Sequence, residues 1–308
     1  MDPMKIGFGA PVAGAWAGPD NLGYFAGRAE ELGYHELWSF HRLLTPADKD
    51  AMAPVYRSVL DPLGALTFAA ARSSRIRLGV AVLNLPFVSP AYLAKQAATL
   101  DVLSGGRLDL GLGTGWQREE FTASGASMER RGARAEEYVA ALHTLWTDEV
   151  SSYEGEFYTI PPSRMAPKPV QRPGPPVLLG GTVEPALKRA GRLGAGWISR
   201  SATDLTRIHE QIAVVRNAAA EAGRDPDSVR VVVRGVVRAG EEQRDEAGGR
   251  VRLTGTYEQI REDVEWLGEQ GVTELFYDLN WDPLVGNPDI APESATARAK
   301  EILEALAP

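Results

Sequence analysis

The chain has 308 residues, of which 44% are hydrophobic and 24% are charged, and its formal net charge is −8. This composition is typical of a globular protein, and the negative charge argues against broad binding to nucleic acids or anionic membranes. The absence of cysteine excludes a disulfide framework, a thiolate nucleophile and a cysteine-ligated metal site. No stretch approaches the ~20 apolar residues of a membrane helix, and residues 1–17 lack a signal-peptide pattern, so we expect a cytoplasmic protein.

Short apolar runs alternate with longer helical patterns along the chain. The first half contains predicted strands at 5–9, 36–39, 76–82 and 107–112, and predicted helices at 21–33, from 61 onward, at 90–103 and at 128–146. A hairpin-like segment at 152–158 and a proline-rich run at 161–176 follow. The second half contains predicted strands at 177–179, 197–199, 228–237 and 275–278, and predicted helices ending at 194 and spanning 204–223, 256–270 and 294–306.

Strict alternation of strands and helices predicts a parallel sheet with right-handed crossovers. About eight such units fit the usual length of a (β/α)8 TIM barrel. We therefore predict an α/β protein with one barrel domain at 1–308 and short insertions, chiefly at about 152–176. A doubly wound open sheet is the alternative, but no composition break or linker divides the chain. In a barrel, functional residues lie where strands end and the following loops begin.

Two glycine-rich turns follow predicted strands. The segment GLGTG at 111–115 has the spacing of neither a dinucleotide-binding motif nor a P-loop, so it is equally consistent with a strand end that needs small residues. Gly180, Gly181 and Thr182 lie between a strand and a helix, where backbone N–H groups and the helix dipole favour a phosphate. A tight turn with a threonine cap is the alternative, and we predict phosphate binding.

His41 directly follows the second predicted strand and precedes a long loop. This placement favours a hydrogen-bonding or proton-handling role, against the alternative of a structural histidine. No zinc-protease, serine-hydrolase or metal-spaced pattern occurs, so we predict no metal site. Few titratable residues but several aromatic residues surround the predicted mouth, namely Trp16, Phe40, Tyr56, Phe87 and Trp116. A planar redox cofactor would explain these features together, whereas the alternative is that the aromatic residues only pack the loops.

Several segments together resemble the bacterial luciferase-like monooxygenase superfamily. They are IRLGVAV at 76–82, AKQAATLDVLSGGR at 94–107, GLGTGW at 111–116, PKPVQRP at 167–173 and LGGT at 179–182. The chain resembles in particular the oxidoreductases that use the deazaflavin coenzyme F-420. This resemblance implies a barrel with a flavin or deazaflavin at its mouth, usually in a homodimer formed through the second and third helices.

The resemblance also implies roles for individual residues. A non-prolyl cis peptide bond against the cofactor ring would join Ala81 to Val82, and His41 matches a histidine near the reactive edge of that ring. Family positions that bind the cofactor correspond to Ala81, Val82, Asn84 and Thr114, and those that bind its phosphate correspond to Gly180, Gly181 and Thr182.

Two positions depart from the family pattern. Many members carry an acidic residue where this chain has Phe40, and the sugar-phosphate dehydrogenases carry a glutamate where it has Trp116. We therefore expect a small, fairly apolar organic substrate in a pocket lined by Trp16, Phe40 and Trp116. Hydride transfer to or from coenzyme F-420 is the leading hypothesis. The alternatives are an FMN-dependent monooxygenase that uses O2 and a non-catalytic flavin- or deazaflavin-binding protein.

Overall fold

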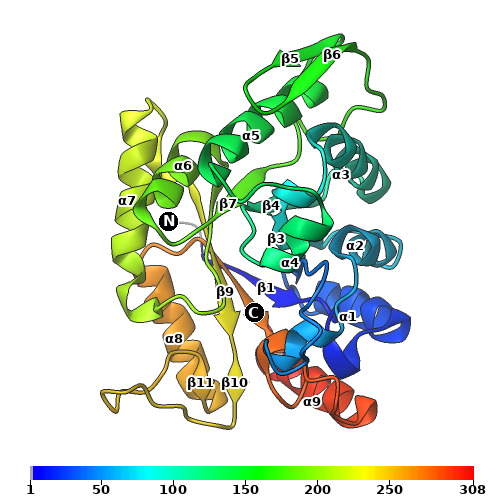
Figure 1. Cartoon of the computed structure of the whole chain (residues 1–308). Helices are drawn as coiled ribbons and strands as arrows, with labels where there is room; N and C mark the ends of the chain where they lie inside the picture. The colour runs from blue at the N-terminus through cyan, green and yellow to red at the C-terminus, as the bar shows by residue number, and fades with distance from the viewer. Residues whose placement is uncertain (1–2) are drawn as a thin grey trace.

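A computed structural model describes residues 3–308, and its parallel strands close into a barrel (Figure 1). Around the barrel the strand order is β1-β12-β9-β8-β7-β4-β3-β2, and β1 pairs with both β2 and β12. The strands are β1 (Lys5–Gly9), β2 (Glu36–Ser39), β3 (Arg77–Asn84), β4 (Leu108–Gly113), β7 (Val177–Gly180), β8 (Gly196–Ile198), β9 (Arg230–Val236) and β12 (Glu274–Asp278). This closure confirms the predicted TIM barrel and excludes the open sheet.

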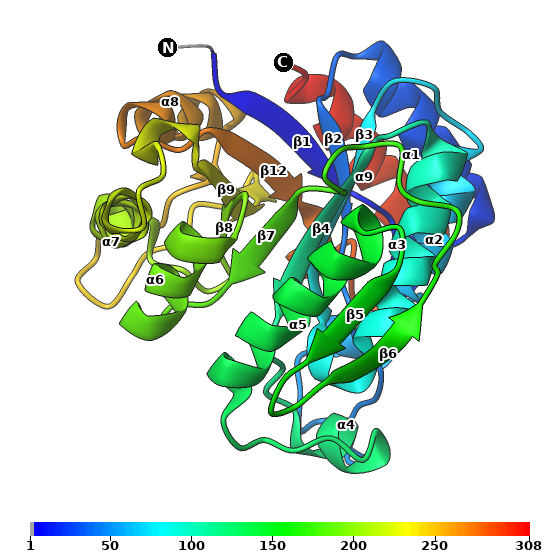
Figure 2. The same cartoon turned by 90° about the horizontal axis from the view of Figure 1, so that it is seen from above.

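Helices surround the strands on the outside, as the view from above shows (Figure 2). They are α1 (Pro19–Glu31), α2 (Pro62–Ala70), α3 (Pro90–Ser104), α5 (Arg131–Thr147), α6 (Glu184–Leu193), α7 (Ile208–Glu221), α8 (Tyr257–Glu269) and α9 (Pro292–Ala305). Side-chain caps fix several starts: Asp61 accepts from the Gly64 backbone N–H, and Thr256 forms a capping box with Gln259. None of the helices within residues 3–308 is both long and apolar enough to span a bilayer.

Apolar residues fill the inside of the barrel as well as the space between strands and helices. Six strands contribute to the inner cluster, which consists of Trp38, Ala81, Leu178, Ile198, Val232 and Phe276. The Trp38 and Phe276 rings stack with centroids 5.2 Å apart. Gly79 faces this stack, where an added Cβ would collide with the Trp38 ring. The barrel is therefore a packed core, which leaves only its open end for a ligand.

Elements outside the regular alternation lie in the loops. The hairpin β5 (Ser151–Glu154) and β6 (Thr159–Ser163) follows α5, within the segment predicted as an insertion. Helix α4 (Arg118–Ala123) and the two-residue strands β10 (Arg238–Ala239) and β11 (Thr254–Gly255) were not predicted, because they are too short for a periodic pattern. Short 3-10 helices occur at Gly14–Trp16, Pro54–Arg57, Leu85–Phe87, Leu205–Arg207, Pro226–Ser228 and Leu279–Trp281.

Candidate functional site

A cavity of about 570 Å³ opens where the barrel strands end. This volume lies in the range of small-molecule sites. The residues around it come from the ends of β2, β3, β4, β7, β8 and β9 and from the loops that follow. Among the predicted site residues, those that line it are Phe40, His41, Ala81, Val82, Asn84, Thr114, Trp116, Gly180 and Gly181. The structure thus brings most of the predicted residues into one place.

The floor of the cavity is built around the Ala81–Val82 peptide bond. This bond is cis, as the family resemblance implies, and the pairing of β3 with β4 shifts register between Val80 and Leu83. The Val82 side chain lies between two glycines: a Cβ added at Gly113 would be 2.5 Å from its Cγ2, and one added at Gly180 would be 3.3 Å from its Cγ1. Small residues at the ends of β4 and β7 therefore make room for Val82.

His41 lies beside this floor, and its tautomer follows from its contacts. The Asn84 backbone N–H donates to His41 Nδ1 at 3.2 Å. Because Nδ1 is an acceptor, the neutral ring carries its proton on Nε2. Burial lowers the pKa of His41, and the charge of Arg42 acts in the same direction, whereas Glu120 and Asp61 oppose the shift. Neutral His41 is thus the favoured form at neutral pH, with Nε2–H as a hydrogen-bond donor.

Arg42 forms a buried ion pair that the sequence did not reveal. Its Nη1 donates to Glu120 Oε2 at 2.8 Å, and Glu120 Oε1 accepts from the Leu43 backbone N–H at 2.7 Å. The Arg42 guanidinium also lies 4.4 Å from the Tyr56 ring centroid and 4.8 Å from that of Trp116. Glu120 belongs to the unpredicted helix α4, so these contacts fix the loop after β2 to the loop after β4.

Arg234 on β9 is a second missed residue at the cavity. Its Nε donates to Asp278 Oδ2 at 2.6 Å, and its Nη1 donates to the Ala81 carbonyl oxygen at 3.1 Å. With Arg42 and the exposed Arg200 on the rim, the mouth holds more charged groups than we expected from the sequence. The only local signal was that Arg234, unlike Arg230 at the start of the strand, interrupts a run of apolar residues.

Two predicted site residues do not line the cavity, and we correct their placement. Trp16 is fully buried: its ring centroid lies 5.1 Å from that of Phe25 on α1, and its Nε1–H donates to Asn280 Oδ1 at 3.1 Å. Thr182 lines a separate groove of about 320 Å³ together with residues of α6 and α7, because the chain turns at Gly181 with φ of 146°. Thr182 does not cap α6 either, since the N-cap position is Val183.

A second polar cluster lies at the opposite end of the barrel, where the strands begin. We call the set Glu36, Arg77, Asp109, Arg230 and Glu274 the basal cluster. Arg230 donates to Glu274 Oε1 at 2.7 Å and to Asp109 Oδ1 at 2.8 Å, and Arg77 donates to Asp109 Oδ2 at 2.7 Å. These bonds satisfy Asp109 and Glu274 with two guanidinium groups.

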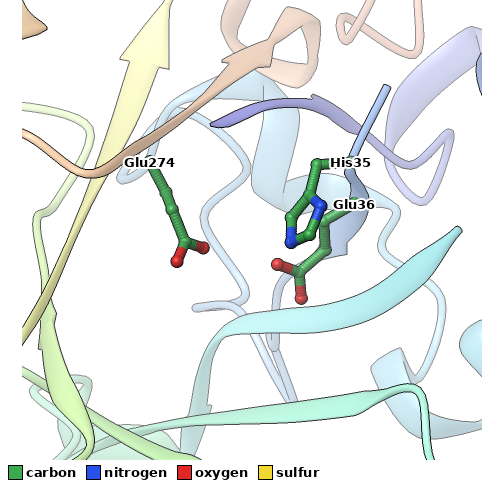
Figure 3. A group of neighbouring side chains, drawn as sticks. All are labelled: His35, Glu36 and Glu274. Atoms are coloured by element: carbon green, nitrogen blue, oxygen red, sulfur yellow. The ribbon is translucent and has the colours of Figure 1, made fainter. Parts of the chain in front are cut away.

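Glu36 is the exception within the basal cluster. Its carboxyl oxygens are buried and form no hydrogen bond to the described residues. Burial raises the pKa of Glu36 well above its usual range, and the charge of Asp109 adds to this effect. Oxygen and nitrogen atoms of His35, Glu36 and Glu274 lie within 4.8 Å of one another (Figure 3), as in a metal site. A neutral Glu36 is a poor ligand, and the two arginines already balance both carboxylates, so we interpret the cluster as structural.

The fold and the cavity define a TIM-barrel protein with a cavity of small-molecule size at the carboxyl ends of its strands. The family model for luciferase-like monooxygenases matches residues 6–271. The chain therefore belongs to the luciferase-like monooxygenase family, which confirms the resemblance seen in its motifs.

Curated relatives show the range of this family. An uncharacterized protein of Mycobacterium tuberculosis is 41% identical over 58% of this chain and 64% of the relative. The F-420-dependent glucose-6-phosphate dehydrogenase of Amycolatopsis mediterranei is 29% identical over 71% of this chain and 64% of the relative. The FMNH2-dependent dimethylsulfone monooxygenase of Pseudomonas putida is 34% identical over 50% of this chain and 42% of the relative. The matched region thus covers less than two thirds of each relative.

Solved structures share the fold over almost the whole chain. The monooxygenase RslO1 from Streptomyces bottropensis superposes with a TM-score of 0.78 and 25% identity, covering 98% of both chains. The coenzyme F-420-dependent tetrahydromethanopterin reductase from Methanopyrus kandleri superposes with a TM-score of 0.76 and 17% identity, covering 98% of this chain and 99% of the reductase. The second match establishes the shared barrel alone.

Proposed function

We propose that this protein is an oxidoreductase that binds coenzyme F-420 at the barrel mouth. In this proposal a hydride passes between the cofactor and a small, fairly apolar organic substrate. The observation that carries the proposal is the floor of the cavity, where Val82 lies between Gly113 and Gly180 and leaves a surface without bulky side chains. A planar ring can approach such a surface closely, while Tyr56 and Trp116 supply aromatic walls.

The residues around this floor fit a flavin-type cofactor. Val82 would contact the ring, Asn84 and Thr114 would bind its polar edge, and the turn at Gly180 and Gly181 would hold the phosphate-bearing arm. When bound, the cofactor supplies the redox chemistry, and the protein supplies position and electrostatics. Thr182 directly follows this turn but lines the neighbouring groove, so we assign the phosphate-bearing arm to Gly180 and Gly181.

His41 would act as a hydrogen-bond donor to the reacting groups. Its Nδ1 is held by the Asn84 backbone N–H, so only Nε2–H is free to face the cavity. A buried donor of fixed orientation stabilises negative charge that develops on a nearby oxygen or nitrogen. No strong base is required for such a hydride transfer, which agrees with the absence of a carboxylate at positions 40 and 116.

Coenzyme F-420 ranks before FMN because the F-420-dependent relative aligns over the larger share of this chain, 71% against 50%. An FMN-dependent monooxygenase is the second candidate, and a non-catalytic cofactor-binding protein is the third. Fluorescence quenching and calorimetry with each cofactor separate the first two. Micromolar binding of FMN without binding of F-420 would favour the monooxygenase, and a lack of turnover across a substrate panel would favour the binding protein.

We also propose a homodimer formed through the outer faces of α2 and α3. Three apolar side chains of α3 face solvent in the single chain, namely Tyr92 (62% exposed), Val102 (40%) and Leu103 (62%). Exposed apolar groups on one helix face are typical of an interface. Analytical ultracentrifugation of the wild type and of Leu103→Glu tests this: a dimer that dissociates in the variant supports it, and a monomeric wild type overturns it.

A further inference from the structure

We propose that Arg234 and Ser199 form a subsite that binds the carbonyl oxygen of the substrate, which would make the substrate an otherwise apolar aldehyde or ketone, or the corresponding alcohol. This inference rests on the proposed function, since it names the substrate class of the same cavity. Ser199 directly follows β8, Arg234 lies on the adjacent strand β9, and both residues line the cavity.

Contacts with three other parts of the barrel hold the Arg234 side chain in place. Asp278 on β12 accepts from Nε at 2.6 Å, and the Ala81 carbonyl oxygen on β3 accepts from Nη1 at 3.1 Å. The guanidinium carbon lies 4.8 Å from the ring centroid of Phe40, which follows β2. A guanidinium fixed in this way loses little conformational entropy when it binds a ligand.

Both residues retain hydrogen-bond donors that no described residue uses. Nη2 of Arg234 donates to none of the residues 3–308, although Arg234 lines the cavity. The Ser199 hydroxyl oxygen accepts from the Arg234 backbone N–H at 2.9 Å, which leaves the hydroxyl hydrogen free to donate. Asp278 neutralises the arginine, so the subsite favours a neutral carbonyl or a transient oxyanion over a permanently charged anion.

The position of the subsite favours the substrate over the cofactor as the source of the oxygen. The predicted cofactor residues that line the cavity lie on or just after the adjacent strands β3, β4 and β7. Arg234 and Asp278 belong to β9 and β12, across the barrel from β3 and β4, whereas Ser199 follows β8, which neighbours β7. The oxygen-binding groups therefore lie at the β8–β9 edge of the floor, where Arg234 Nη1 contacts the Ala81 carbonyl oxygen, and not on the strands that carry the predicted cofactor residues.

The chemistry of carbonyl reduction matches these donors. When bound, reduced F-420 would supply the hydride that the carbonyl carbon accepts. The C=O π electron pair would then move to the oxygen, and the resulting alkoxide would take a proton from solvent to give the alcohol. Oxidation of the alcohol is the reverse. In both directions the negative charge develops on the oxygen, where a guanidinium and a hydroxyl donor stabilise it.

Binding of a matched pair of probes tests the inference without turnover. Fluorine NMR measures the dissociation constants of 4-fluoroacetophenone and 4-fluoroethylbenzene, which differ only in the carbonyl group, for protein with and without bound cofactor. The variants are Arg234→Lys, which keeps the charge beside Asp278, and the double variant R234Q/D278N, which removes both charges. Arg164→Gln is the control, because it deletes a guanidinium from an exposed ion pair with Glu149. Melting temperatures establish that each variant is folded.

We expect both Arg234 variants to weaken binding of the ketone about ten- to hundredfold and to leave binding of the ethylbenzene and of F-420 within about twofold. Equal weakening of both probes, no weakening, or weakening of F-420 binding alone overturns the inference. If the wild type binds neither F-420 nor FMN, the proposed function is wrong. Binding of the ketone to the cofactor-free protein then still tests the role of Arg234.

Discussion

The two ends of the barrel both gather charged residues, yet they differ in what those residues leave unused. In the basal cluster, all three guanidinium nitrogens of Arg230 donate to Asp109 or Glu274. Arg77 donates to Asp109 from Nε and Nη2, and its Nη1, which donates to none of the residues 3–308, does not line the cavity. At the mouth, Arg234 is held just as firmly but keeps donors that face a cavity. Unused hydrogen-bond donors that line a cavity, and not charge itself, therefore distinguish the barrel mouth from the basal cluster.

The largest expected effect is the loss of stability from Asp109→Asn. Asp109 accepts hydrogen bonds from both arginines of the basal cluster and is completely buried, so its removal leaves one positive charge uncompensated, because only Glu274 still pairs with Arg230. We expect a decrease of about 3–5 kcal/mol in the free energy of unfolding, measured by urea denaturation, with no change in the affinity of the remaining folded protein for F-420. A loss of cofactor affinity without a loss of stability would break the comparison.

Gly113→Ala is expected to have the next largest effect, at the other end. The new methyl group would displace Val82 from its place between the two glycines. We expect weaker F-420 binding and a decrease of about 1–3 kcal/mol in stability, as for overpacked cores. The double variant G113A/V82A removes the collision, so it should recover most of the stability; an equal defect in the double variant would contradict this explanation.

Glu36→Gln should change how stability depends on pH. Burial raises the pKa of Glu36 in the folded state, so the folded protein retains a proton that the unfolded chain releases. The stability gained from this retained proton is fully present below the ordinary pKa of about 4.5, and it is lost as the pH rises toward the pKa of Glu36 in the folded state. Relative to wild type, the variant should therefore gain up to about 1.4 kcal/mol per pH unit above that point. Parallel stability curves for the two proteins between pH 5 and 8 would disprove the assignment.

The smallest expected effect is that of His41→Phe on cofactor binding. The variant keeps an aromatic ring but loses Nε2–H, so we expect F-420 affinity to fall about three- to tenfold. His41→Gln restores an amide donor and should recover part of the loss, while His209→Gln on the exposed face of α7 is the control. Because burial lowers the pKa of His41, wild-type binding should remain constant from pH 6.5 to 8; a titration within that range would contradict the neutral form.

The barrel could be predicted from the sequence because its signals are local. Apolar runs such as 5–9 and 275–278 mark strands, and capping residues such as Asp61 mark the starts of helices. Each signal lies within a few residues of the element that it marks. The position of His41, directly after a strand, placed it at the mouth by the same logic. These features depend on the immediate neighbours of each residue.

The polar contacts of the site could not be predicted in this way. Arg234 pairs with Asp278, which is 44 positions away, and Arg42 pairs with Glu120, which is 78 positions away. Such partners are set by the three-dimensional arrangement, and α4 was too short to show a helical period. Trp16 was misplaced for a related reason: its position after a strand is correct, but its side chain turns toward Phe25 and away from the mouth.

The two glycines on either side of Val82 also allow the depth of the site to be changed by substitution. The methyl group of an alanine at position 180 would lie 3.3 Å from Val82, so the valine side chain would need to shift only slightly. The methyl group of an alanine at position 113 would lie 2.5 Å from Val82 and would displace the valine side chain. The pair therefore offers protein engineers a graded steric control over which ring systems the mouth admits, one that leaves every polar group of the site unchanged.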